Sequence, residues 1–228
     1  MARRGQTVIA LALLATVGLC CWYVSLSARR AQLDQALFTA VGNNDVAAAE
    51  NALRHGANPN AMPSAWNSLE GRTLLNPRAW PTLLEWVRTQ RLRPYPPLYF
   101  AKDPAMVRLL VAHSANPDGT GGSTYRTPLM AAAARGNLTV VRALVAAGAD
   151  VNQRDKLGFT ALLLATADLR SGVLPGAEGP YGQVIRVLLE SGADVNARHP
   201  KGATALAMAE RSPHAKIVQI LKRAGAQR

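Results

Sequence analysis

This chain has little cysteine, and its two cysteines cannot crosslink a folded domain. Cys20 and Cys21 are adjacent to each other inside the most apolar stretch of the sequence. No C-x-x-C pair or similar metal-ligand spacing occurs, which argues against a disulfide scaffold and a structural zinc site. A chain with so little cysteine tolerates an oxidising compartment, so its composition permits export.

The sequence also lacks the motifs that carry common enzyme chemistry. It has no G-x-S-x-G elbow, no glycine-rich phosphate loop followed by lysine, and no H-E-x-x-H. The four histidines are far apart and include no i, i+4 pair, and the aspartates form no convincing pair of carboxylates. We therefore predict a protein that is not an enzyme, with no catalytic residues, metal, cofactor or small-molecule substrate.

Acidic residues and lysine are scarce, whereas arginine is abundant. The 228-residue chain has 21 Arg and 5 Lys against 14 acidic residues, a formal charge of +12. Such a balance can indicate an acidic protein partner, a membrane surface or nucleic acid. Because the positive charge is spread along the chain without a long basic run, nucleic acid is the least favoured of these partners. The preference for arginine, with much alanine, also suggests a bacterial origin.

An uncharged run near the N-terminus predicts a membrane segment. Residues 8–26 carry no charge and have a pair of arginines on either side. A helix of this length can cross a bilayer core, so residues 1–30 are predicted to form a transmembrane anchor. The alternatives are a signal sequence that is cleaved near Ser27 and a buried core helix.

The orientation of this segment follows from its short basic tail, which usually stays in the cytoplasm. We therefore expect a single-pass protein of the bacterial inner membrane, with the remaining chain in the periplasm. If the segment is cleaved instead, the chain is secreted to the periplasm.

A pattern with a period of 33 residues fills much of residues 31–228. One block opens at Thr127-Pro128-Leu129, and the next opens 33 residues later at Thr160. The closing sequence G-A-D-V-N occurs twice, starting at Gly148 and at Gly192. Another block opens at Thr204, 44 residues after Thr160, so an insertion of about 11 residues is predicted within residues 169–182. Weaker copies lie upstream, and residues 61–96 are either a degenerate repeat or an insertion.

Each block reads as a helix, a turn and a second helix. Thr127 is suited to cap a helix, and Pro128 fits the first helical position because its missing N–H needs no partner there. Gly136 turns the chain, and Gly148 can end the second helix in a left-handed conformation. An extended, hairpin-like loop then leads to the next block.

These residues resemble the ankyrin repeat, whose signature begins T-P-L-H-x-A. The resemblance implies an all-α fold, an ankyrin-repeat solenoid of about five helix-turn-helix repeats, here preceded by one transmembrane helix. It also implies that the loop tips and inner helices line a concave face that binds other proteins. The tip positions in this chain are Tyr125, Arg126, Arg154, Lys156, Arg198, His199 and Lys201.

We interpret these tip residues as a surface for an acidic protein partner, since arginine and tyrosine often dominate binding energy. The alternative for each of them is an ordinary solvated loop residue. The favoured function is a membrane-tethered adaptor or accessory protein that binds, stabilises or inhibits an exported partner. The second candidate is a cytoplasm-facing scaffold whose basic face binds anionic membrane or nucleic acid.

Overall fold

The computed structural model describes residues 26–62, 95–167, 179–211 and 215–227. Nearly all of the predicted membrane anchor, residues 8–26, lies outside these ranges. In the ranges that are described, no helix is both long and apolar enough to cross a membrane.

The described residues form helices and two isolated β-bridges, with no strand. A first helix covers residues 26–43 of the described chain. It is followed by α2 (Val46–Arg54), η3 (Pro97–Phe100), α4 (Pro104–Ala112), α5 (Pro128–Ala134), α6 (Leu138–Ala146), α7 (Ala161–Ala167), α8 (Gly179–Glu190), α9 (Ala205–Ala209) and α10 (Ala215–Arg223). The element η3 is a single 3₁₀ turn.

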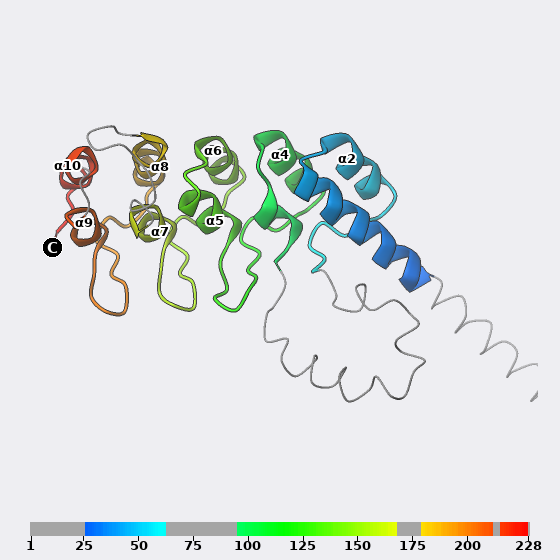
Figure 1. The fold of residues 1–228 in the computed structure, drawn as a ribbon, viewed down its shortest axis with the longest axis horizontal. Helices are drawn as coiled ribbons and strands as arrows, with labels where there is room; N and C mark the ends of the chain where they lie inside the picture. The colour runs from blue at the N-terminus through cyan, green and yellow to red at the C-terminus, as the bar shows by residue number, and fades with distance from the viewer. Residues whose placement is uncertain (1–25, 63–94, 168–178, 212–214, 228) are drawn as a thin grey trace, which may run out of the picture.

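These elements stack as helix pairs in two rows (Figure 1). The outer row consists of α2, α4, α6, α8 and α10, each in contact with the next. The inner row consists of η3, α5, α7 and α9, again with neighbours in contact. With the helix 26–43 beside α2, the described chain contains five pairs. The all-α prediction and the predicted series of helix-turn-helix units are therefore confirmed for this part of the chain.

The inner helices begin where the repeated threonines predict. The hydroxyl of Thr127 accepts a hydrogen bond from the Met130 N–H at 3.2 Å, and Thr204 caps α9 in the same way. Thr160 accepts from the Leu163 N–H at 3.3 Å. Each hydroxyl satisfies a backbone N–H that has no partner within its own helix.

Short side chains allow the inner helices to approach each other closely. Ala132 and Ala133 of α5 are fully buried, as are Leu162 and Leu163 of α7. One helix pair cannot cover this apolar surface alone, so each repeat depends on its neighbours for a core.

The closing asparagine of each regular repeat links it to the following repeat. The Asn152 side-chain amide donates to the Gly192 carbonyl at 2.9 Å, and its oxygen accepts from the Asp194 N–H at 2.7 Å. Asn60 and Asn196 make the same pair of bonds to the next units. We call this arrangement the asparagine staple.

The last residues of the predicted insertion, 169–182, are helical. The helix α8 begins at Gly179, since proline fits the first turn of a helix at Pro180. The Tyr181 hydroxyl also donates to the Ala134 carbonyl at 3.1 Å, which holds this turn against α5. Residue 30, where the predicted anchor ends, lies within the helix that covers residues 26–43, and the anchor boundary stays a prediction.

Candidate functional site

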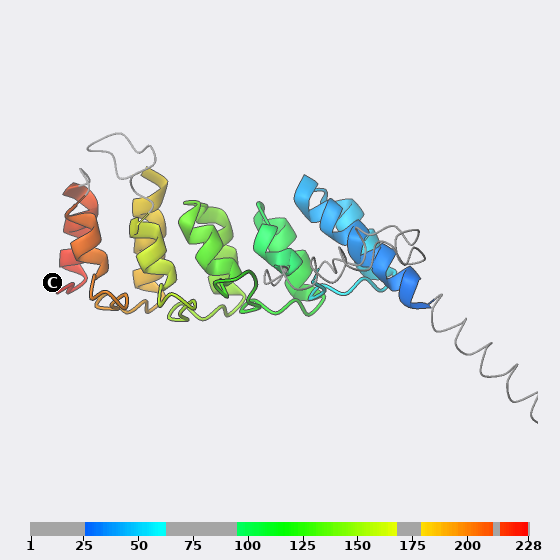
Figure 2. The ribbon, with the colours of Figure 1, turned by 60° about the horizontal axis from the view of Figure 1, so that its bottom comes forward.

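Three hairpins descend from the inner row on the same side of the stack, and their tips lie side by side (Figures 1 and 2). They comprise residues 118–127, 152–160 and 196–204. Each is closed by its own backbone hydrogen bonds, such as those between Gly121 and Arg126 in the first. We call the surface that they form together the hairpin surface.

The first two hairpins are joined by polar contacts. Arg126 Nε lies 3.3 Å from the Asp155 carboxylate, whose side chain is fully buried. The Lys156 N–H donates to the Thr124 carbonyl at 2.8 Å. The Lys156 ammonium also lies 5.8 Å from the centre of the Tyr125 ring, within range of a cation–π contact. The two tips are therefore held in a fixed relation.

Asp155 is the central residue of this junction. One oxygen of its carboxylate accepts hydrogen bonds from the N–H groups of Leu157 and Phe159, at 2.9 and 2.8 Å, and the other receives Arg126. Sequence reasoning did not assign Asp155 this role. The available signal was an aspartate three residues before Gly158, a spacing typical of an aspartate that bonds its own turn.

Arginine side chains also fix the second and third hairpins. One amino group of Arg154 donates to the Arg198 carbonyl at 2.8 Å and lies 3.3 Å from the Gly158 carbonyl. Arg198 donates to the Gly202 carbonyl of its own turn at 3.1 Å. The His199 ring lies 4.3 Å from the Phe159 ring, in a tilted contact. Both junctions between hairpins are thus defined by specific contacts.

The structure places all seven predicted tip residues on the hairpin surface, where they differ in their contacts. Arg126 and Arg154 hold neighbouring hairpins together, and Arg198 closes its own hairpin. Lys156 and Lys201 are exposed. Beside Lys156 lies Leu157, which is 47% exposed and was not among the predicted site residues. An exposed leucine next to a lysine at a hairpin tip is a candidate apolar contact for a partner.

A group of aromatic rings lies next to the first hairpin. Tyr95 and Tyr99 stack with their centroids 3.7 Å apart, and Phe100 meets the Tyr99 ring edge-on. Arg135 donates to the Tyr99 carbonyl at 2.9 Å. Burial, together with the hydrogen bond to Tyr95, raises the pKa of Tyr99 to about 12. The tryptophans Trp66, Trp80 and Trp86 precede these tyrosines in the sequence and lie outside the described residues.

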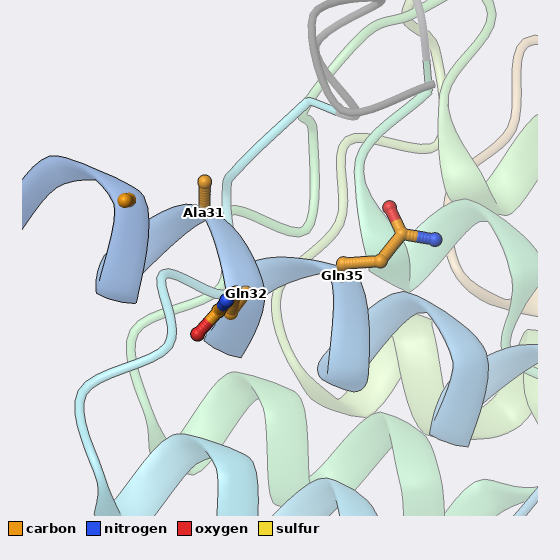
Figure 3. Close-up of a pocket in the computed structure, with 4 residues that line it drawn as sticks. Ala31, Gln32 and Gln35 are labelled. Atoms are coloured by element: carbon orange, nitrogen blue, oxygen red, sulfur yellow. The ribbon is translucent and has the colours of Figure 1, made fainter. Parts of the chain in front are cut away.

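No metal-binding cluster is evident in the part of the chain that the structure describes. No group of three or more His, Cys, Asp or Glu side chains there could hold a metal ion. A cavity of about 350 Å³ lies against the first helix, where Ala28, Ala31, Gln32 and Gln35 line it (Figure 3). These side chains include no acid, base or nucleophile.

Comparison with known proteins bears on the central repeats. Residues 94–173 match a family described as ankyrin repeats, in three copies. No curated protein matches the chain. The matched segment contains η3, the helices α4 to α7 and the first two hairpins, so the family match and the described helix pairs coincide. Repeats of this family form protein–protein interaction modules.

Proposed function

We propose, on the premise that this chain is an ankyrin-repeat protein, that it is a non-enzymatic, membrane-tethered adaptor. Its hairpin surface binds an exported protein partner, which it stabilises or inhibits. The proposal joins three parts: an interaction domain, a basic face for an acidic partner, and an N-terminal anchor at residues 8–26.

The observation that carries the proposal is the mutual fastening of the three hairpins. Arg126 joins the first tip to Asp155 of the second, and Arg154 joins the second to the third. A surface that is already ordered loses less conformational entropy when it binds. These contacts therefore favour the hairpins as a prearranged recognition surface over three independent loops.

The chemistry of the exposed tips indicates the kind of partner. Lys156 and Lys201 supply positive charge, and Leu157 supplies an exposed apolar side chain at the tip of the second hairpin. Charge complementarity steers association and gives specificity, whereas a central apolar or aromatic anchor supplies much of the affinity. The expected epitope is an acidic surface with a small apolar depression.

The location of this partner depends on the N-terminal segment. With the short basic tail in the cytoplasm, the repeats face the periplasm and meet exported proteins. An accessory role predicts that loss of the chain lowers the activity of one exported enzyme. An inhibitory role predicts that cells without it become sensitive to one toxin or lipase.

A topology assay tests the membrane part of the proposal. A reporter that is active only outside the cytoplasm is fused after Arg228, and retention of residues 1–27 is measured on the same chain. Activity on an uncleaved, membrane-bound chain supports the anchored adaptor. An inactive reporter overturns the periplasmic location and favours the cytoplasm-facing scaffold.

Charge reversal at a tip tests the binding surface. The double variant Lys156→Glu/Leu157→Asp is compared with Lys216→Glu, which reverses an exposed charge on α10 away from the hairpins. We expect the tip variant to lower partner recovery after crosslinking at least about tenfold, and Lys216→Glu to change it little. If both variants lose partner recovery equally, or if recovery depends only on the salt concentration, a nonspecific basic surface is favoured.

A further inference from the structure

An apolar groove lies between α4 and α6 in the outer row, away from the hairpin surface. Its volume is about 440 Å³. The helix α4 lines it with Val107, Arg108, Val111 and Ala112, and α6 lines it with Ala143, Ala146 and Ala147. We call this feature the α4–α6 groove. None of its residues belongs to the hairpin surface, so it is a separate candidate site.

The groove exists because α6 presents alanines where the next outer helix carries larger groups. Gly148 and Gly192 close equivalent helices 44 residues apart, which sets the register between α6 and α8. In this register Ala143, Ala146 and Ala147 correspond to Val187, Glu190 and Ser191. Short side chains leave a space that larger ones would fill. The α4–α6 groove is therefore consistent with the small residues that α6 presents at this junction.

The border of the groove is positively charged. Arg108 is exposed, and neither α4 nor α6 contains an acidic residue. In the described ranges, Arg108 makes no ion pair. The equivalent position of α2 is Glu50, which pairs with Arg54 on its own helix. Only a ligand that brings its own negative charge would pair with Arg108.

The walls of the groove restrict the form of that ligand. Both walls are α-helices, whose interior N–H and C=O groups already bond within the helix. An extended peptide would gain no backbone pairing there, in contrast to a peptide that adds to a sheet edge. A helix satisfies its own backbone and presents apolar side chains at i, i+3 and i+4, so it suits a groove lined by alanine and valine.

We propose that the α4–α6 groove binds an acidic amphipathic helix of a partner protein. The apolar face of that helix lies against the valines and alanines, and an Asp or Glu on its flank pairs with Arg108. Since the groove and the hairpin surface lie on different sides of the stack, both can be occupied together. The proposal does not depend on which partner the hairpins bind.

The test uses the full-length chain in phosphatidylcholine nanodiscs, with empty nanodiscs as the blank. The probes are two fluorescent helical peptides of about 14 residues, a length near the limit for isolated helices. Both have leucine along one face, and they carry either glutamate or lysine on the flanks. Fluorescence anisotropy gives the affinities, and hydrogen exchange locates the protected residues.

We expect the glutamate peptide to bind at least about tenfold more tightly than the lysine peptide, because only glutamate pairs with Arg108. Arg108→Glu should reverse this preference. The matched control is Arg142→Glu, at the equivalent exposed position of α6, which is not among the groove-lining residues; it should preserve the preference. Protection should fall on residues 107–112 and 143–147.

Variants that fill the groove test whether the peptides bind inside it or are attracted only by the positive charge of the chain. Ala146 and Ala112 are both exposed, so Ala146→Leu and Ala112→Leu should fold, as circular dichroism would verify, and should weaken both peptides about tenfold. Equal affinity for both peptides, no detectable binding, or equal effects of Arg108→Glu and Arg142→Glu would overturn the proposal. Binding to phosphatidylglycerol vesicles is measured for the same variants. If a variant loses vesicle binding but keeps its affinity for both peptides, the proposal is overturned in favour of a lipid surface.

Discussion

Among the described residues, the C-terminal repeats (127–227) begin their inner helices with capping threonines, whereas the N-terminal part (26–118) shares the asparagine staple at Asn60 but uses different contacts in its inner row. Threonine hydroxyls cap the N-termini of α5 and α9. In the second pair, the inner helix is reduced to η3, and Lys102 donates to the Gly42 carbonyl of the preceding unit. Two different sets of side chains thus support one architecture.

The junction at Asp118 shows how the difference is compensated. Asp118 occupies the staple position and accepts from the Asp150 N–H at 2.9 Å, but a carboxylate has no N–H to donate to the neighbouring carbonyl. At the other end of α5, Arg135 and Asn137 donate to the carbonyls of Tyr99 and Lys102, so other polar contacts also join these two units. The lesson is that a repeat need not keep every signature contact to stack.

The largest effect is expected at the buried carboxylate of the second hairpin. Asp155→Ala leaves two backbone N–H groups and Arg126 without their acceptor, and should lower the free energy of unfolding by about 3 kcal/mol. Asp150→Ala removes an exposed turn acceptor and should cost about 1 kcal/mol or less. Urea unfolding compares the two, and equal losses would contradict the central role of Asp155.

Alanine substitution at two equivalent glycines distinguishes the stability cost of backbone strain from the cost of a clash between hairpins. Gly158 and Gly202 have φ angles of 77° and 81°, where alanine costs about 1–2 kcal/mol. A Cβ at Gly158 would also lie 2.5 Å from the Pro200 ring, whereas nothing lies within 4 Å at Gly202. Gly158→Ala should therefore destabilise the chain more than Gly202→Ala, by about 1 kcal/mol. Thermal unfolding measures this difference, which would vanish if the tips did not pack together.

The asparagine staple can be removed at Asn152 and introduced at Asp118, where only its accepting hydrogen bond is present. Asn152→Ala loses both inter-repeat hydrogen bonds and should lower stability by about 1–2 kcal/mol. Asp118→Asn supplies an amide N–H that can donate to a carbonyl of the following repeat, as the other staples do, and should raise the free energy of unfolding by about 0.5 kcal/mol. Chemical denaturation should show opposite signs, and a loss in Asp118→Asn would mean that this junction requires its carboxylate.

The smallest effect concerns the aromatic group beside the first hairpin. The pKa of Tyr99 rises from 10.0 to about 12, so the folded chain holds this proton more tightly than the unfolded chain. Its stabilising contribution is complete below about pH 10 and is lost as the pH rises through about 12. Tyrosinate absorbance should show a late titration step that Tyr99→Phe removes. A Tyr99 signal that titrates near pH 10 would argue against burial.

The tip residues illustrate how far sequence reasoning reached. It placed all seven on one surface, because the 33-residue period locates each junction between repeats. It did not distinguish Arg126 and Arg154, which fasten neighbouring hairpins, from the exposed Lys156 and Lys201. It also missed the exposed Leu157, because the exposure of an isolated leucine is not encoded in the local pattern.

By itself the sequence determined the helix pairs, their caps and the order of the repeats, since capping and helical periodicity act between residues only a few positions apart. Only the tertiary structure decided which carbonyl Arg154 reaches, how Asp155 joins two hairpins, and that α4 and α6 leave a groove between them. Those contacts join residues 29 or more positions apart, and they depend on how neighbouring repeats stack and on the volume of each facing side chain.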